Sequence, residues 1–288
     1  MSTKRAAQAR LAASAALGAR ATLKVKPWNA IDVFDCAQQA GIEVLFAKIP
    51  SMEGMYLRKS TPTILVGSER PSGRQRFTCA HEWGHHVFGD GSRVDELFDS
   101  DNAQQQRDEV EIRANMFAGM LLMPKSAVDR GFASRGLKPD TASPVEFFRV
   151  ACWLGVGFAT LANHLRYGLQ AISDVRFREL DRCSPKQIRK ALVGCDEGNE
   201  LILVDDKWSD RPIDVSVNDL VLAPSGSEIE GTSCAQHSVL PSGVLCRAVT
   251  PGISRIELRS GWASFVRVSR EKYAGRGIFR HLQEEEDE

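Results

Sequence analysis

The spacing of hydrophobic residues changes several times along the first half of the chain. Residues 29–40 carry apolar side chains at near-helical spacing and stop at Gly41, which predicts a first packed helix. Three short runs rich in β-forming residues follow, at residues 42–46, 55–57 and 63–66. Because Pro50, Gly54 and Pro62 separate these runs, we predict a small sheet.

A helical period then begins at Ser72. Its apolar stripe consists of Phe77, Ala80, Gly84 and Phe88. Ser72 with Gln75 three residues later fits a capping box, and Gly89 followed by Asp90 and Gly91 fits a helix stop. We therefore predict one amphipathic helix between Ser72 and Gly89.

Two more helical segments are expected downstream. The polar, acid-rich residues 91–108 are interpreted as a surface loop, and a helix from about Gln105 to Met123 stops before Pro124. Residues 143–170 show two apolar faces broken at Gly155-Val156-Gly157, a spacing typical of a helix-turn-helix.

From about residue 174 the pattern turns to strands. Short runs alternate or stay apolar between Gly, Pro and Asp turns, and they lie at residues 201–204, 219–222, 244–249, 254–258 and 264–268. We expect an α+β protein with four parts: a basic N-terminal arm (1–26), a domain built on the Ser72 helix (27–142), a helix-turn-helix-like segment (143–173) and a β-rich C-terminal domain with an acidic tail (174–288).

The strongest chemical signal lies inside the Ser72 helix. His81 and His85 are four residues apart, so their imidazoles point at one spot, and two neutral nitrogens suit zinc. Both border the apolar stripe and so face the interior. Glu82 lies beside them, within reach of a bound water rather than of the ion. The alternative is a chance triplet whose imidazoles are simply satisfied in a core.

A catalytic zinc usually takes three protein ligands and keeps a fourth position open. In the helix that ends at Met123, Glu111 shares the apolar stripe, whereas Glu109 lies above Arg113 on the polar side. A buried carboxylate is costly unless it is paired or bound to a metal. Glu111 is therefore the candidate third ligand, and an ion pair with an arginine is the alternative.

Two stretches together resemble the ImmA/IrrE family of bacterial and phage zinc metallopeptidases. They are Thr78-Cys79-Ala80-His81-Glu82-Trp83-Gly84-His85 and Glu111-Ile112-Arg113-Ala114-Asn115-Met116-Phe117-Ala118-Gly119-Met120-Leu121-Leu122-Met123-Pro124. They resemble the family's His-Glu-x-x-His helix and its downstream Glu-x-x-Ala-Asn-x-Phe-Ala-x-x-Leu-Leu-Met-Pro segment. The resemblance covers about residues 27–170.

This resemblance implies a zincin-like peptidase fold with zinc (Zn2+) as cofactor. It makes His81, His85 and Glu111 the metal ligands and Glu82 the general base. Family members cleave transcriptional repressors, often in stress response, phage induction or mobile-element control. The resemblance therefore implies a regulatory metalloendopeptidase whose substrate is a protein, such as a helix-turn-helix repressor.

Composition narrows the class of partner. Lys plus Arg and Asp plus Glu both number 37, so no global charge favours nucleic acid or a membrane. Residues 1–31 are basic without an acid and 284–288 are all acidic, and both ends are interpreted as solvated tails, the first as a short exposed helical arm. The seven cysteines show no Cys-x-x-Cys pair, which favours free thiols and a cytoplasmic protein. No run approaches transmembrane length.

Several secondary hypotheses remain open at this stage. The candidate recognition helix, residues 158–166, offers only Asn163, His164 and Arg166 to DNA, so packing or partner contact is favoured over direct DNA binding. His86 and Tyr56 are candidate oxyanion donors. The run 63–66 is a candidate edge for an extended substrate. Four arginines, Arg267, Arg270, Arg276 and Arg280, form either a basic face or a solvated strand edge.

Two rival functions share the same residues. A mononuclear iron oxygenase also uses two histidines and one carboxylate, although such ligands usually come from strands. The second rival is a non-catalytic, metal-containing regulator that binds a repressor or DNA. Only a peptidase needs Glu82 as a base.

Overall fold

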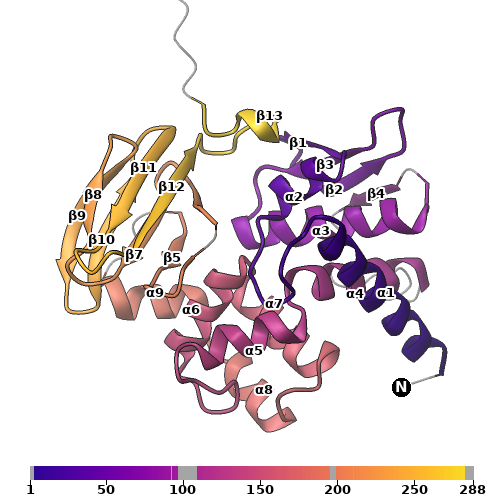
Figure 1. Ribbon diagram of the computed structural model, residues 1–288, viewed down its shortest axis with the longest axis horizontal. Coiled ribbons are helices and arrows are strands. Elements are labelled where there is room, and N and C mark those ends of the chain that lie inside the picture. The colour runs from indigo at the N-terminus through magenta and orange to yellow at the C-terminus, as the bar shows by residue number, and fades with distance from the viewer. Residues whose placement is uncertain (1–2, 92, 97–108, 195–198, 210, 283–288) are drawn as a thin grey trace, which may run out of the picture.

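The protein is described from a computed structural model over residues 3–91, 93–96, 109–194, 199–209 and 211–282. Residues 97–108 of the loop expected at 91–108, and the acidic tail at 284–288, lie outside these ranges. The architecture is mixed α and β, as expected, with one helix-covered sheet near the N-terminus and two further sheets near the C-terminus (Figure 1).

Most expected elements are present, with shifted ends. The helices are α1 (Thr3–Thr22), α2 (Val33–Gln39), α3 (Ser72–Phe88), α4 (Glu109–Leu122), α5 (Lys125–Ala133), α6 (Pro144–Leu154), α7 (Phe158–Asn163), α8 (Asp174–Asp181) and α9 (Pro185–Val193), with a π-helical turn η2 (His164–Gly168) and a 3-10 turn η3 (Gly277–Phe279). The strands are β1 (Glu43–Ala47), β2 (Met52–Leu57), β3 (Thr63–Gly67), β4 (Arg93–Glu96), β5 (Leu201–Leu203), β6 (Ile213–Ser216), β7 (Leu220–Ala223), β8 (Glu228–Glu230), β9 (Cys234–Leu240), β10 (Gly243–Ala248), β11 (Gly252–Glu257), β12 (Ala263–Ser269) and β13 (Gly275–Arg276).

The N-terminal sheet has the strand order β13-β1-β3-β2-β4. Strand β3 pairs in parallel with β1 and antiparallel with β2. Both of its edges are therefore occupied, and the prediction that residues 63–66 offer an edge to an extended substrate is wrong. Within the described residues the outer strand next to β2 is β4, which lies in the segment that we interpreted as a loop.

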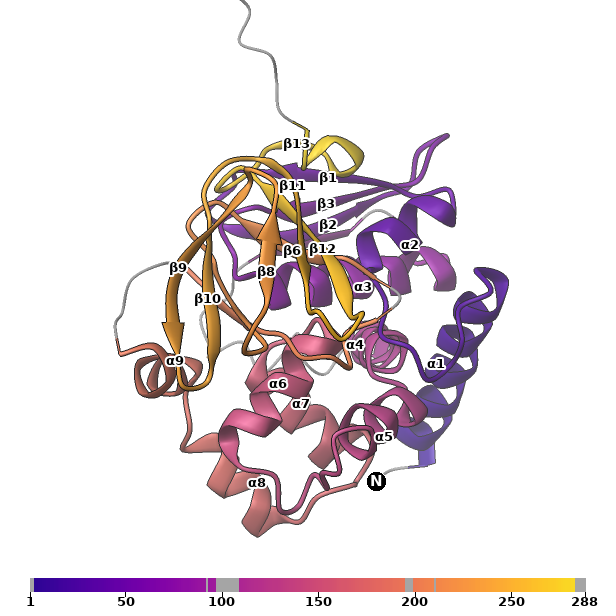
Figure 2. The ribbon, with the colours of Figure 1, turned by 60° about the vertical axis from the view of Figure 1, so that its left-hand side comes forward.

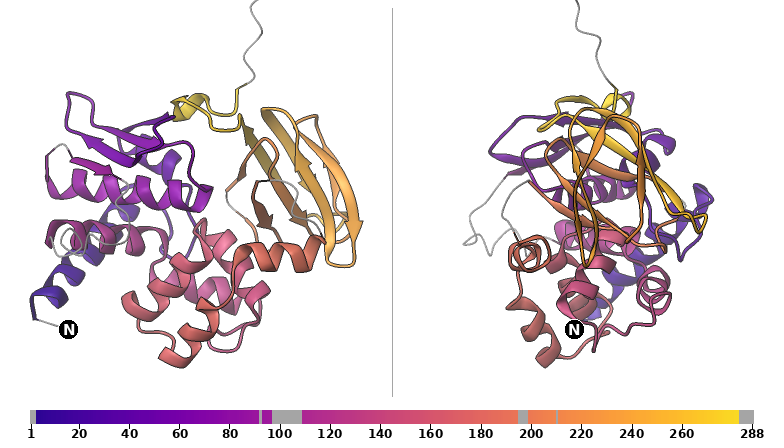
Figure 3. Two further views of the ribbon diagram at one scale, coloured as in Figure 1. Left: turned by 180° about the vertical axis from the view of Figure 1, so that it is seen from behind. Right: turned by 90° about the vertical axis from the view of Figure 1, so that its left-hand side faces the viewer.

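Helix α3 lies between this sheet and α4 (Figure 3). It begins where predicted, but the capping box is wrong: Pro71 is the N-cap, and the Gln75 side chain donates to the carbonyls of Ser68 and Arg70. The first helical N–H, on Ser72, instead donates to the Glu200 carboxylate at 2.6 Å, so a distant segment supplies the acceptor. The predicted stop is confirmed, since Gly89 adopts a left-handed conformation with φ 70°.

The N-terminal arm is a docked helix. Helix α1 packs along α4, on the side away from α3, and buries Ala12 and Ala16 completely. Arg20 is also buried and donates to the carbonyl of Leu121 at 2.7 Å. The expected helix is thus confirmed, but the expected exposure is wrong, because alanines four residues apart make a flat face that fits closely against α4.

The helical segment α6–α7 turns sharply at residues 155–157, with 94° between its two halves. Gly155 caps α6 in a left-handed conformation. His164 hydrogen-bonds the Met123 carbonyl at 2.9 Å, and Arg166 donates to Asp174 at 2.6 Å. Asn163 donates to the Ala159 carbonyl at 2.9 Å, so all three side chains considered for DNA contact are engaged within the chain.

Taken singly, none of the helices in the described ranges combines the length and apolar character needed to cross a membrane. The bent pair Pro144–Leu154 and Phe158–Gly168 meets both requirements only when its halves are taken together.

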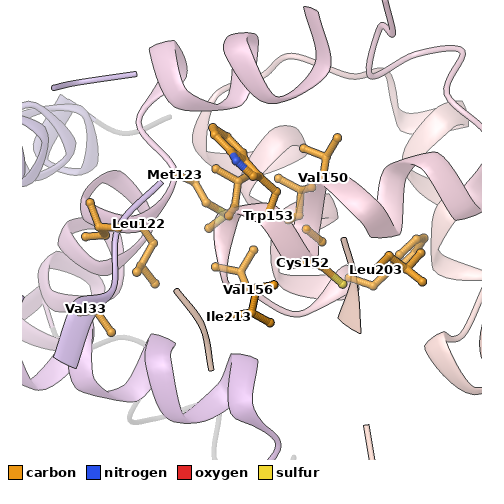
Figure 4. Close-up of a cluster of buried hydrophobic side chains, with 14 of the residues drawn as sticks. Val33, Leu122, Met123, Val150, Cys152, Trp153, Val156, Leu203 and Ile213 are labelled. Atoms are coloured by element: carbon orange, nitrogen blue, oxygen red, sulfur yellow. The ribbon is translucent and has the colours of Figure 1, made fainter. Parts of the chain in front are cut away.

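One hydrophobic core runs through all parts of the described chain. Figure 4 shows its centre, where Val33 of α2, Leu122 of α4, Trp153 of α6 and Ile213 of β6 meet. Because this core is shared, the part of the chain that contains α3 and α4 and the part that follows α9 are packed together rather than linked by a free tether.

The expected C-terminal strands are present, but the prediction that strands begin near residue 174 is wrong. Helices α8 and α9 occupy most of residues 174–193, and α9 starts with a capping box between Ser184 and Gln187. Two four-stranded sheets follow, with strand orders β5-β7-β10-β9 and β6-β12-β11-β8 (Figure 2). The last strand, β13, returns to pair with β1 of the N-terminal sheet.

The arginines near the C-terminus do not form a free basic face. Arg267 contacts Asp32, Asp35 and Asp214 at 2.6–2.8 Å, and Arg280 approaches the same three carboxylates at 3.0–3.4 Å. Arg276 pairs with Glu43 at 2.8 Å. We call Asp32, Asp35, Asp214, Arg267 and Arg280 the charge cluster. It joins α2 to the C-terminal sheets.

Candidate metal centre

Helices α3 and α4 approach closely because a glycine lies at their contact. A Cβ on Gly84 would lie 3.1 Å from the Cα of Ala114 and 3.3 Å from the ring of Phe117. A side chain at this position would push the helices apart. Gly84 is the third residue between His81 and His85, so the closest packing falls where the candidate ligands project.

Side chains from both helices meet at this point. The Nε2 atoms of His81 and His85 lie 3.0 Å apart, and the Oε2 atom of Glu111 lies 3.1 Å from the first and 3.5 Å from the second. All three ligand atoms fall within 4.8 Å of one another. The structure thus brings together the three residues that the sequence pattern indicated.

The second ring nitrogen of each imidazole, Nδ1, contacts a hydrogen-bond acceptor. His85 Nδ1 lies 3.2 Å from the carboxylate of Asp90, and His81 Nδ1 lies 3.1 Å from Oδ1 of Asn115. A carboxylate or amide oxygen only accepts, so each Nδ1 carries the hydrogen and each Nε2 presents a lone pair. Arg113 donates to Asp90 at 2.6 Å and fixes that carboxylate in turn.

This arrangement fits a metal ion. Two imidazole lone pairs and a carboxylate oxygen converge, and a cation between them offsets their mutual repulsion. Ligand atoms around a tetrahedral zinc with bonds of about 2.0–2.1 Å lie roughly 3.3 Å apart. The three separations here, 3.0, 3.1 and 3.5 Å, bracket that value. In metal sites, the other ring N–H of a metal-binding histidine typically donates to such an acceptor.

The environment keeps Glu111 ionised. Burial opposes its charge, but the adjacent His81 and His85 imidazoles more than offset that effect and lower the pKa of Glu111 below its usual value. A carboxylate must be deprotonated to bind a metal, so this residue is ready as a ligand near neutral pH.

Glu82 projects from the same helical turn and is fully buried. Strand β2 passes over it at Gly54, where a Cβ would lie 2.9 Å from Glu82 Oε1 and 2.3 Å from a methyl carbon of Thr78. Only a residue without a side chain lets the strand lie this close. The backbone of β2 therefore forms one wall around the Glu82 carboxylate.

The two candidate oxyanion donors are neighbours. The hydroxyl of Tyr56, on β2, lies 2.8 Å from Nδ1 of His86, the residue after His85. Burial and the nearby Arg58 guanidinium lower the pKa of His86, so its ring is neutral at pH 7. Tyr56 follows Gly54 by two residues and so faces α3 as Gly54 does. The pair thus lies one helical turn beyond Glu82.

Several residues of the centre were not identified from the sequence. Asn115 lies four residues after Glu111, so helical spacing already placed it beside that ligand. Asp90 was noted only as part of the helix stop, and its contact depends on the chain reversal at Gly89. The contact of Gly54 with Glu82 depends on sheet packing against α3, which no local pattern predicts.

Comparisons with known proteins give matches over the region that contains this cluster. Residues 37–165 match the family model Peptidase_M78, the IrrE N-terminal-like domain. The radiation response metalloprotease IrrE of Deinococcus radiodurans is 27% identical over 89 residues, which cover 31% of this chain and 27% of that protein. The protein of the same name from Deinococcus deserti is 32% identical over 90 residues, which cover 31% of this chain and 32% of that protein.

The chain therefore spans about a third of the length of the curated relatives that it matches. The matched region contains α3, α4 and the His81, His85 and Glu111 cluster. Over residues 37–165 this chain is therefore similar to the IrrE N-terminal-like domains of the Peptidase_M78 family.

Proposed function

We propose that this protein is a zinc-dependent metalloendopeptidase that cuts a protein substrate. The observation that carries the proposal is the convergence of the His81, His85 and Glu111 ligand atoms within 4.8 Å, with Glu82 on the same helical turn. The family match and the relatives, which are named metalloproteases, support a metal-dependent peptidase over the two rivals.

Each residue has a separate role in this proposal. His81, His85 and Glu111 hold the ion, and Asn115 and Asp90 orient the two imidazoles. When bound, zinc supplies Lewis acidity toward a carbonyl oxygen and acidifies water beside it. Glu82 accepts the proton of the attacking water and delivers it to the leaving amine. The enclosed position of Glu82 under β2 keeps its carboxylate in one orientation.

The Tyr56–His86 pair is the proposed source of the oxyanion donor. If the Tyr56 hydroxyl donates to His86 Nδ1, the His86 proton is on Nε2 and is available to an oxyanion. If the Tyr56 hydroxyl instead points its hydrogen away from His86, Tyr56 itself is the donor to the oxyanion. Tyr56 faces α3 and His86 lies on it, one turn from Glu82, so either assignment uses the same pair.

The proposed substrate is a helix-turn-helix transcriptional repressor, and the proposed role is regulatory. This step rests on the family resemblance and on the relatives' description as radiation response proteins. Direct DNA binding by the α6–α7 segment is not part of the proposal, because His164 and Arg166 are held within the chain.

The test is cleavage by zinc-loaded protein and by its Glu82→Gln variant. Repressors encoded beside this protein serve as substrates, and mass spectrometry locates the cut sites. We expect the wild type to cut at least one repressor, and the variant to retain zinc but lose about two to four orders of magnitude in rate. Excess chelator should abolish cleavage. Equal activity of the two proteins would favour the non-catalytic regulator instead.

A further inference from the structure

A groove of about 440 Å³ lies beside the metal centre and plays no part in the proposed chemistry. Its floor and walls come from α1, α3, α4, α7 and η2. Its apolar lining includes Phe77, Ile112, Met116, Met120 and Met123, with Ala9 of α1 on one rim. We call these six residues the methionine groove. A volume of this size suits a ligand with several apolar groups.

The groove adjoins the metal centre through Asn115. Asn115 hydrogen-bonds the ligand His81 and also lines the groove. Ile112 directly follows the ligand Glu111, and Phe77 lies one helical turn before His81. From Ile112 to Met123 the helix rises about 16 Å, which matches roughly five residues of extended polypeptide. A chain that is cut at the metal centre therefore reaches this groove.

The lining indicates the chemistry of the occupant. Methionine side chains are flexible and polarisable, so they adapt to apolar groups of different shape. Polar residues, among them Arg74 and Asn163, also line the groove. The groove thus fits a peptide segment with large apolar side chains better than a charged or a rigid small ligand.

We propose that the methionine groove binds the substrate polypeptide on one side of the scissile bond. It selects segments with leucine, isoleucine, methionine or phenylalanine at two or more positions within about five residues of the cut. This inference rests on the proposed peptidase function and adds a specificity site to it. Helix α1, which lies outside the matched family region, then contributes to substrate selection through Ala9.

Two alanines of α1 provide a matched pair of variants. Ala9 is partly buried at the groove, whereas Ala7 is exposed on the same helix. Ala9→Trp should fill the groove without touching a metal ligand, and Ala7→Trp should place the same ring in solvent. A peptide library digested by the zinc-loaded full chain should show apolar residues enriched on one side of the cut.

The expected result is a selective loss. Ala9→Trp should lower kcat/KM for the preferred peptides about tenfold to a hundredfold, mainly through KM. The kcat/KM for peptides without apolar residues should not change. The zinc content and the circular dichroism spectrum of the variant should also match those of the wild type. Ala7→Trp should match the wild type. If the library shows no apolar preference, or if the two variants behave alike, the groove proposal is overturned while the peptidase function stands.

Binding tests the groove without catalysis. Fluorescence anisotropy compares a labelled leucine-rich peptide with its serine-substituted counterpart on the zinc-loaded protein. The wild type should prefer the leucine-rich peptide about tenfold, and Ala9→Trp should remove that preference. Met120→Ala serves as a second variant that should weaken the preference for the leucine-rich peptide. Met55→Ala is its control, because Met55 lies on the face of β2 that points away from α3. No cleavage by the wild type would contradict the peptidase function, and equal peptide affinities would contradict the groove.

Discussion

At the residue scale, Gly54 has little freedom to change. Replacing it by alanine adds a carbon within 2.9 Å of Glu82 Oε1 and 2.3 Å of a Thr78 methyl carbon. The strand or the carboxylate must shift, and small displacements of a catalytic group are costly in rate. We expect Gly54→Ala to lose at least about tenfold in kcat while it retains zinc.

Gly18 provides the control for that substitution. It lies on α1, and apart from its chain neighbours and its own helix backbone no atom of the described residues lies within 4 Å of the position that an added methyl group would take. Gly18→Ala should therefore preserve activity and gain up to about 1 kcal/mol of helix stability. Kinetics and zinc content of the two purified variants check the prediction. Full activity of Gly54→Ala would show that the contact with Glu82 does not constrain the base.

His164 links stability to pH. Burial lowers the pKa of this imidazole to about 4, although its bond to the Met123 carbonyl acts in the opposite sense. In the unfolded chain the His164 imidazole takes up its proton near pH 6.5, whereas in the folded chain it does so only near pH 4. His164 therefore stabilises the fold above pH 6.5, and this contribution is lost as pH falls toward 4.

We expect the His164 contribution to the free energy of unfolding to fall by about 2 kcal/mol across this interval, after allowance for the partial exposure of the ring. Urea unfolding at about pH 7.5 and about pH 4.5 measures the change. His164→Gln keeps a donor for Met123 but cannot titrate, so its stability should depend less on pH. An identical pH dependence in both proteins would refute this assignment.

Residue spacing predicted that His81, His85 and Glu111 come together, because these side chains follow helical geometry. His81 and His85 need only one turn of α3, and Glu111 needs only an inward face on α4. The partners Asp90 and Gly54 could not be predicted, since their contacts arise from a chain reversal and from strand-on-helix packing. The arginines near the C-terminus were misjudged for the same reason: their carboxylate partners lie far away in sequence.

At the scale of elements, the charge cluster connects α2 with β6 and β12. Burial opposes the ionisation of Asp214, but Arg280 and Arg267 hold its pKa well below the usual value. Removing one arginine leaves buried carboxylates with too little positive charge. We therefore expect Arg267→Ala to lower the free energy of unfolding by about 3–5 kcal/mol.

Arg255 on the neighbouring strand β11 is the matched control. Its contacts with Glu230 and Glu257 are exposed, so Arg255→Ala should cost no more than about 1 kcal/mol. Thermal unfolding of both variants gives the comparison. Similar losses in the two would mean that the charge cluster adds nothing beyond a surface ion pair.

Period and turn residues predicted most elements whose burial pattern is regular, such as α3, β1, β3 and β12. They missed β4, α8 and α9 because short or polar elements carry little periodic signal. Helix α9 buries only Ile188, yet its Ser184–Gln187 capping box was visible in the sequence. The start of α3 was placed correctly but for a wrong reason, because the acceptor for the Ser72 N–H is Glu200 and the predicted Ser72–Gln75 capping box is absent.

At the scale of the whole molecule, the C-terminal part packs against the part that contains α3 and the N-terminal sheet. Glu200 accepts from the first turn of α3, the charge cluster holds α2, and β13 extends the N-terminal sheet. These contacts join residues after 199 to the elements around α3. The boundary predicted near residue 174 remains a prediction about sequence units, and the shared core shows that those units pack as one body.

The central claim is that one zinc ion binds between α3 and α4. X-ray absorption at the zinc edge of the purified, metal-loaded protein tests it most directly. We predict one zinc per chain, with imidazole scattering and nitrogen or oxygen neighbours at about 2.0–2.1 Å. A shell of sulfur neighbours near about 2.3 Å, or a zinc signal that persists unchanged in the His81→Ala, His85→Ala double variant, would contradict it.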